Sequence, residues 1–179
     1  MSDLVEKCQK SSKIYSGRML HVFKDDVELP NGHVTTREYI KHPGAAVMIP
    51  VLPDGDIMLI KQFRYPIGMT HIELPAGKLD PGESHLETAQ RELEEEIGYK
   101  SNKLTELTEI HPCTGYSDEK MWIYLAEDLE KTQSNMDHDE FIELFPVSLE
   151  KAITMVWSGE ITDVKTIIGL LWGNRILSS

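Results

Sequence analysis

The segment that decides the fold has the sequence GKLDPGESHLETAQRELEEEIGY and spans residues 77–99. Ser84 and Glu87 form an S-x-x-E capping box, the pattern that starts a helix, and Gly98 has the residue type that commonly follows a helix end. These signals predict a helix over residues 84–97. At 100° per residue, one stripe of this helix is apolar and is expected to face the core; it consists of Leu86, Ala89, Leu93 and Ile97.

Two carboxylates, Glu92 and Glu96, are four residues apart on the edge of this stripe, and the helical wheel places no lysine or arginine beside them. Glu95, in contrast, lies beside Arg91 at positions i+4 and i. Like charges at this spacing cost a helix about 0.2–0.5 kcal/mol per pair unless a cation binds between them. A hard divalent cation with oxygen ligands, Mg²⁺ or Mn²⁺, suits such a pair. The alternative from these residues alone is a solvated acidic face.

The complete spacing of the segment decides between these two interpretations. It matches without a gap the signature of the Nudix hydrolases, G-x5-E-x7-R-E-U-x-E-E-x-G-U, in which U is a bulky apolar residue. Tyr99 occupies the last position, where an aliphatic residue is commoner. The other fixed positions are filled by Gly77, Glu83, Arg91, Glu92, Leu93, Glu95, Glu96 and Gly98. The segment therefore resembles the Nudix box.

The resemblance implies a role for each carboxylate of the box. Glu92 and Glu96 are expected to be metal ligands, together with the backbone carbonyl of Ala76 just before the loop glycine. Glu95 is expected to pair with the arginine of the box, to hold the helix to the loop and to belong to the catalytic set. Glu83 either reaches the metal shell from the positive end of the helix dipole or is an ordinary first-turn glutamate.

Strand and helix signals are mixed along the rest of the chain, with turns at Asn31-Gly32 and at residues 53–56. Strands are expected at 19–23, 25–29, 34–40, 45–52, 57–63, 103–111, 121–126 and 141–145, helices at 149–157 and 163–172, and a polar loop at 127–139. With the resemblance, these elements predict an α+β Nudix fold. A mixed β-sheet is sandwiched between helices (α/β/α), with an additional N-terminal antiparallel sheet. We divide the chain into an N-terminal β-sheet region, residues 1–43, and a Nudix hydrolase domain, residues 44–179.

Composition and charge narrow the classes of partner. The chain has 179 residues, and 40% are hydrophobic, which is enough for the core of one globular protein. A formal net charge of −12 argues against binding long nucleic acid, because such proteins present a basic face. No apolar run has the length of a membrane span, and Cys8 and Cys113 lack zinc-site spacing. We expect a cytoplasmic protein with a small anionic substrate and no membrane partner.

The flanks of the box resemble the ADP-ribose pyrophosphatase branch and its nucleotide-sugar relatives. The resemblance lies in residues 37–45, 61–65 and 73–77. It implies a domain-swapped homodimer, in which the N-terminal sheet reaches across to complete the partner's site. Arg37 and Glu38 would then bind the adenine end of the substrate. The alternative for Arg37 is an exposed strand residue without such a role.

The same resemblance assigns Arg64 and Glu73 to substrate binding, with Arg64 at the phosphates. A guanidinium suits bidentate phosphate contact, and the alternative for Arg64 is a surface ion pair. Glu140 is the expected general base, because this branch carries its base on a loop after the box; the alternative is a surface glutamate at a strand edge. Thr114 stands where relatives that cut ADP-ribose often have proline, which favours a broader preference among nucleotide sugars.

These features favour Mg²⁺- or Mn²⁺-dependent hydrolysis of the pyrophosphate bond of nucleoside diphosphate sugars. ADP-ribose is the expected substrate, GDP-mannose and others are further candidates, and the products are a nucleoside monophosphate and a sugar phosphate. One alternative is a house-cleaning nucleoside triphosphate pyrophosphatase, which uses the same box and releases pyrophosphate. Another is a catalytically silent domain that senses nucleotides or binds proteins. Such a domain would have lost box glutamates, and all of them are present.

Overall fold

The computed structural model describes residues 4–133 and 141–178, which form two compact units. The first unit consists of the chain up to Pro43 together with His111–Lys120. Residues 111–120 join it because the backbone N–H of Ile40 donates to the carbonyl of Tyr116 at 2.8 Å. The second unit contains Gly44–Ile110 and the chain from Met121 onward. The assignment of residues 1–43 as a dimer-forming region stays a prediction.

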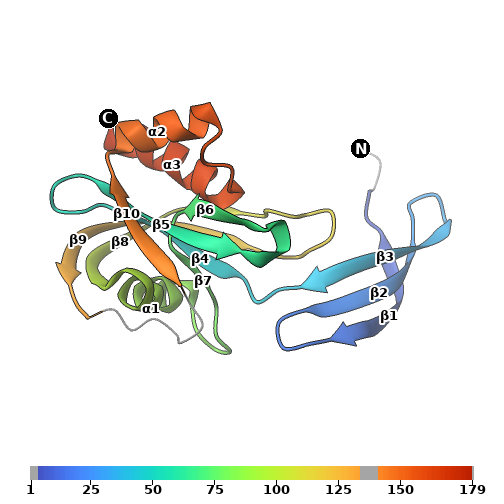
Figure 1. Ribbon diagram of the computed structural model, residues 1–179. Helices are drawn as coiled ribbons and strands as arrows, with labels where there is room; N and C mark the ends of the chain where they lie inside the picture. The colour runs from blue at the N-terminus through green and yellow to red at the C-terminus, as the bar shows by residue number, and fades with distance from the viewer. Residues whose placement is uncertain (1–3, 134–140, 179) are drawn as a thin grey trace. The chain divides into compact units, whose positions relative to one another are not determined.

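The first unit is built on an antiparallel sheet in the order β1-β2-β3. Its strands are β1 (Lys7–Ser16), β2 (His21–Glu28) and β3 (Val34–Lys41), as Figure 1 shows. The prediction of separate strands at 19–23 and 25–29 was wrong, since β2 is continuous. Most of β1 was missed because nearly all its side chains are exposed, so it lacks the apolar alternation that indicates a strand.

Two sheets form the middle of the second unit. The first has the order β7-β4-β9-β8, in which β4 and β9 are parallel and the other pairs antiparallel, so the predicted mixed sheet is confirmed. The second has the order β10-β5-β6. The bounds are β4 (Ala45–Pro50), β5 (Ile57–Arg64), η1 (Tyr65–Ile67), β6 (Met69–Glu73), β7 (Ala76–Lys78), β8 (Tyr99–Ile110), β9 (Met121–Lys131) and β10 (Ile142–Val147).

Helices cover both faces of these strands (Figure 1). They are α1 (His85–Ile97), α2 (Leu149–Ser158) and α3 (Val164–Leu177). Alternate side chains of β4 enter different cores: Val47 and Ile49 pack in one cluster with residues of α2 and α3, whereas Ala46 and Met48 pack in another with Leu93 of α1. The predicted α/β/α arrangement is confirmed. In the part of the chain that the structure describes, no helix is long and apolar enough to cross a membrane.

Two further expectations differ from the structure. Leu86 is exposed, although the helical wheel placed it on the buried stripe. The first turn of α1 is instead held by His85, whose ring stacks on Trp122 with centroids 4.5 Å apart. The polar loop expected at 127–139 is a strand as far as Lys131, because β9 continues to pair with the beginning of β8. Residues 134–139 of that loop lie outside the described residues.

Candidate active site

The position of α1 is fixed at both ends by the predicted caps. The Ser84 side chain accepts a hydrogen bond from the backbone N–H of Glu87, and the Glu87 carboxylate accepts one from the backbone N–H of Ser84. Gly98 ends the helix in the left-handed conformation, at φ 69°. Both cap predictions are confirmed. The caps fix where α1 begins and ends, and the packing of Ala89, Leu93 and Ile97 in the core determines which carboxylates face the sheet.

The two predicted metal-binding carboxylates lie on the inner face of α1, against β7. Glu92 is 9% exposed and Glu96 is 4% exposed. The backbone N–H of Ala76 donates to Oε2 of Glu96 at 3.1 Å. Oε1 of Glu92 lies so close to Gly77 that a Cβ built there would be 1.7 Å away. The structure therefore brings Ala76, Gly77 and both glutamates together.

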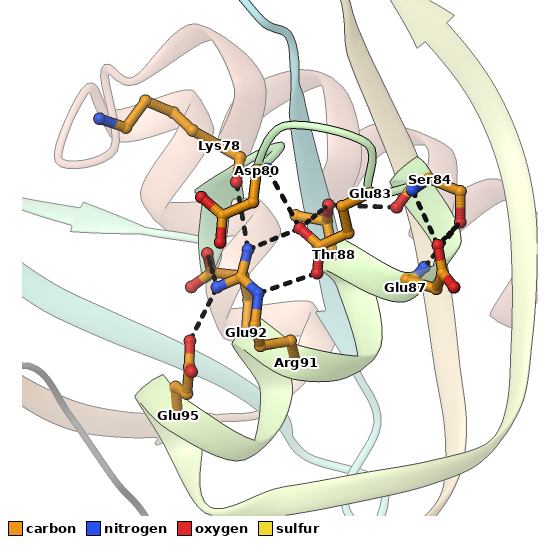
Figure 2. Close-up of polar contacts among 9 residues, drawn as sticks. All are labelled: Lys78, Asp80, Glu83, Ser84, Glu87, Thr88, Arg91, Glu92 and Glu95. Atoms are coloured by element: carbon orange, nitrogen blue, oxygen red, sulfur yellow. Dashed lines mark hydrogen bonds and ion pairs between the residues drawn. The ribbon is translucent and has the colours of Figure 1, made fainter. Parts of the chain in front are cut away.

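Arg91 connects three carboxylates of the box (Figure 2). Its Nη1 donates to Oε2 of Glu95 and to Oε1 of Glu92, each at 2.8 Å, and its Nε donates to Oε1 of Glu83 at 2.9 Å. The predicted pair of Glu95 with Arg91 is confirmed. The prediction that Glu92 lacks a cationic partner was wrong. The helical wheel records only the directions of Cβ atoms, whereas the long arginine side chain reaches the neighbouring residue.

Glu83 joins the loop before α1 to the helix itself. Its carboxylate accepts hydrogen bonds from Arg91, from the Thr88 hydroxyl at 2.7 Å and from the backbone N–H of Asp80 at 3.2 Å. The hydrogen bonds from Arg91 contribute most to lowering the pKa of Glu83, which falls to about 2 although burial opposes the change. Glu83 precedes the N-cap Ser84, so it is not a residue of the first turn; as an anion it joins the loop to the helix. Its role in the metal shell stays a prediction.

Arg64 and Glu73 form a second charged pair, at the ends of β5 and β6. Nε of Arg64 donates to Oε1 of Glu73 at 2.7 Å and Nη2 donates to Oε2 at 2.6 Å. The Arg64 side chain is 40% exposed, whereas that of Glu73 is 2% exposed and also contacts Lys165. Burial by itself raises the pKa of Glu73, but Arg64 and Lys165 outweigh it and lower the pKa to about 2. Arg64 is thus the member of the pair that faces solvent.

Comparison with known sequences identifies the family. The sequence model of the NUDIX domain matches residues 41–165, which is more than half of the chain. The chain belongs to the Nudix family. The matched range contains the whole of the box, the Arg64–Glu73 pair and Lys165.

Individual relatives match this Nudix chain over nearly its whole length. A Bacillus subtilis (strain 168) protein named ADP-ribose pyrophosphatase is 44% identical over 168 residues, covering 93% of this chain and 91% of the relative. A Bacillus methanolicus protein named methanol dehydrogenase activator is 38% identical over 167 residues, covering 92% and 90%. The crystal structure of an ADP compounds hydrolase matches with a TM-score of 0.86, covering 97% and 94%, and its identity of 24% supports the fold alone.

The oxygen donors of this Nudix box fit a hard divalent cation. Among the described residues there is no group of three or more His, Cys, Asp or Glu side chains placed to hold a metal ion. Glu92 and Glu96 nevertheless lie one helical turn apart beside Ala76, whose backbone carbonyl is the further predicted donor. Mg²⁺ characteristically takes one or two carboxylates and completes its shell with waters and substrate phosphates. The donor set therefore fits magnesium or manganese bound together with substrate.

Gly77→Ala is expected to lower turnover by about 100-fold, because a new Cβ would displace the carboxylate of Glu92. Since this carboxylate is the end of a flexible side chain, the fold should be retained. Steady-state kinetics and thermal unfolding of the purified variant check both parts. Gly173→Ala is the matched control, because its Cβ would make ordinary contacts with Ile49 at 3.5 Å. Full activity in Gly77→Ala would contradict the placement of Glu92.

The hydrogen bonds of the Glu83 carboxylate are expected to make part of the free energy of unfolding depend on pH. The folded pKa of about 2 lies below the ordinary 4.5, so this contribution is complete above pH 4.5 and is lost as the pH falls toward 2. Urea unfolding of the wild type and of Glu83→Gln should show a difference in the free energy of unfolding at neutral pH that shrinks over this range. A difference that stays constant down to about pH 2 would show that Glu83 is not held as an anion.

The remaining predicted site residues lie elsewhere. Arg37 is on β3 of the first unit, where its Nη2 is 2.6 Å from Oε1 of Glu6. Oε1 of Glu38, its neighbour on the same strand, is 3.1 Å from Nζ of Lys24. Glu140 lies outside the described residues. The roles of Arg37, Glu38 and Glu140 in substrate binding and catalysis stay predictions.

Lys165 is a candidate that the sequence analysis did not select. It is 5% exposed and lies in the first turn of α3, where Nζ contacts Glu73 and also Oδ2 of Asp163 at 3.0 Å. A signal for it exists in the sequence, because Lys165 is the one charged residue in the mostly apolar run at 164–172. A lysine in such a run is seldom buried without a carboxylate partner. That partner, Glu73, is 92 residues away in the sequence.

Proposed function

We propose that this chain is a hydrolase that cleaves the pyrophosphate bond of nucleoside diphosphate sugars. ADP-ribose is the first candidate substrate and GDP-mannose is a further one. The products are a nucleoside monophosphate and a sugar phosphate. The observation that carries the proposal is the pair of nearly buried carboxylates, Glu92 and Glu96, held against β7 in a chain of this family. Similarity over nearly the whole length to the Bacillus subtilis ADP-ribose pyrophosphatase supports the substrate class.

The metal is proposed to be Mg²⁺ or Mn²⁺, held by Glu92, Glu96 and the carbonyl of Ala76. A divalent cation bound there would polarise a phosphate oxygen and lower the pKa of a bound water. Arg64 binds the diphosphate through its solvent-facing guanidinium. Glu140 accepts a proton from the attacking water. The oxygen of that water bonds to phosphorus, and the bridging P–O bond breaks.

Arg91 and Glu95 support this chemistry by holding the carboxylates in place. Arg91 bonds Glu92 directly and also bonds Glu83 and the carbonyl of Lys78 in the preceding loop. Glu95 accepts a hydrogen bond from Nη1 of Arg91, the same atom that donates to Glu92. Glu95 therefore limits the positions that the guanidinium can take. Both residues therefore set the position of Glu92, one of the proposed metal ligands.

We further propose a domain-swapped homodimer in which Arg37 and Glu38 of one chain bind the adenine end of the substrate in the other. The first unit supports this proposal because its small sheet leaves the apolar side chains Ile14, Tyr15 and Val34 exposed. Sedimentation equilibrium should give twice the mass of the chain. A monomer that retains full activity would contradict the swapped site. The cytoplasmic location stays a prediction.

A substrate panel tests the proposed function. ADP-ribose, GDP-mannose, other nucleotide sugars, dinucleoside polyphosphates and nucleoside triphosphates are each incubated with the full chain and Mg²⁺, and the products are separated by chromatography. Turnover of ADP-ribose and several other nucleotide sugars to a nucleoside monophosphate and a sugar phosphate supports the proposal. Release of pyrophosphate from triphosphates, without turnover of nucleotide sugars, would instead support a house-cleaning enzyme.

A further inference from the structure

A charged cluster lies behind Arg64, between β6 and the first turn of α3. It contains two carboxylates, Glu73 and Asp163, and two cations, Arg64 and Lys165. Lys165 contacts Oε2 of Glu73, the same oxygen that accepts from Nη2 of Arg64. Glu73 therefore links a nearly buried lysine to an arginine that faces solvent.

The backbone around this cluster is also held by hydrogen bonds in which Lys165 takes no part. The Thr166 hydroxyl accepts from the backbone N–H of Leu74 at 2.8 Å and donates to Oδ2 of Asp163 at 2.6 Å. Asp163 is also the N-cap of α3 and accepts from the backbone N–H of Thr166. Thr166 and Asp163 thus attach α3 to the strand end without Lys165. The lysine charge is therefore not needed to join these two elements.

A buried ion pair is a poor means of stabilising a fold, because removing two charges from water offsets most of their attraction. Lys165 is more readily explained by its effect on Arg64. Without Lys165, the full negative charge of Glu73 would act on Arg64 alone and would draw the guanidinium toward the interior. With Lys165 present, the charge of Glu73 is shared between two cations. The positive charge of Arg64 is then less offset by the carboxylate and attracts an anionic ligand more strongly.

The geometry of Arg64 agrees with this effect. Its two bonds to Glu73 use Nε and Nη2, and the Nη1 donors take no part in this pair. The hydrogen bonds with Glu73 are the largest cause that raises the pKa of Arg64, and the charges of Asp163 and Glu96 add to them. The charge of Glu96, a proposed metal ligand, therefore acts on Arg64 as well.

We propose that Lys165 is a positioning residue for the diphosphate site: by balancing the charge of Glu73 it orients the Arg64 guanidinium and strengthens the attraction of this part of the site for the substrate phosphates. The inference rests on the proposed function, in which Arg64 binds the diphosphate. The proposed role concerns substrate affinity more than the chemical step. Lys165 is buried and acts on Arg64, a proposed phosphate-binding residue, through Glu73.

Kinetics of a double-mutant cycle test this role, with ADP-ribose as substrate. Lys165→Met should raise KM about tenfold and change kcat less than about threefold, the pattern of lost uniform binding. Glu73→Gln introduced into Lys165→Met should bring KM back to that of Glu73→Gln alone, because no carboxylate remains for the lysine to offset. Lys103→Met, which removes an exposed lysine paired with Glu127, is the control and should leave KM unchanged.

The outcomes separate this inference from the proposed function. Absence of nucleotide-sugar turnover by the wild type overturns both. Wild-type turnover with an unchanged KM in Lys165→Met overturns the inference alone. If Lys165→Met does not fold, Glu73→Gln is compared with the double variant, and equal KM values are expected. Different KM values in that comparison would show that Lys165 acts without Glu73 and would overturn the inference.

Discussion

Glu96→Gln is expected to lower kcat for nucleotide-sugar hydrolysis by about 1000-fold while the fold is kept. The substitution replaces an anionic oxygen of the proposed metal site by a neutral amide and removes several kcal/mol of charge stabilisation. The amide oxygen still accepts the hydrogen bond from the backbone N–H of Ala76, which Glu96 receives at 3.1 Å. Metal-dependent activity is therefore lost for a chemical reason and not through unfolding. Initial rates over a Mg²⁺ titration measure the effect.

Glu130→Gln is the matched control for this experiment. Glu130 is exposed on β9 and accepts a hydrogen bond from Nδ2 of Asn102 at 2.8 Å, which an amide oxygen retains. The control should keep the wild-type rate, and both variants should unfold at wild-type temperatures. A Glu96→Gln variant with normal kcat at every Mg²⁺ concentration would exclude Glu96 as a metal ligand.

Arg91→Met is expected to lower kcat about 100-fold and the free energy of unfolding at neutral pH by about 3 kcal/mol. The change leaves the carboxylates of Glu83, Glu92 and Glu95 without the guanidinium that contacts all three, and an uncompensated, partly buried charge is costly. Glu92 would also lose the bond that holds it beside Gly77. Urea unfolding and steady-state kinetics measure the two effects separately.

Arg91→Lys separates charge from geometry at the same position. A lysine keeps the positive charge, but its ammonium cannot reproduce the five hydrogen bonds that the guanidinium donates to Glu83, Glu92, Glu95 and the carbonyl of Lys78. Stability should therefore recover in part while kcat stays low. If Arg91→Lys restored full activity, the fork geometry of Arg91 would be unimportant and only its charge would matter.

Local signals made α1 predictable. The capping box at Ser84 and Glu87 and the terminal Gly98 act within a few residues of one another, so the helix bounds follow from the sequence. The place of Glu92 and Glu96 beside the apolar stripe was predicted from the sequence, whereas their burial was found only in the structure. The error over Leu86 arose because helical periodicity does not show how far the sheet extends beneath the first turn.

Long-range contacts were less accessible to sequence reasoning. The contact between Glu73 and Lys165 joins residues 92 positions apart, and no local pattern indicates that pairing. The bond from Arg91 to Glu92 depends on the rotamer of a long side chain, which a helical wheel does not describe. Most of β1 was missed because a strand with nearly all side chains exposed has no apolar alternation.

Product analysis with ADP-ribose tests the central claim most directly. The purified full chain is incubated with ADP-ribose and Mg²⁺ in water labelled with heavy oxygen. A chelator is then added to the reaction, and finally Mg²⁺ is restored in excess of the chelator. The account predicts AMP and ribose 5-phosphate with the label on one of the two phosphates, loss of cleavage on chelation and its return with the metal. Absence of cleavage in the presence of Mg²⁺, or cleavage at an unchanged rate after chelation, would contradict it.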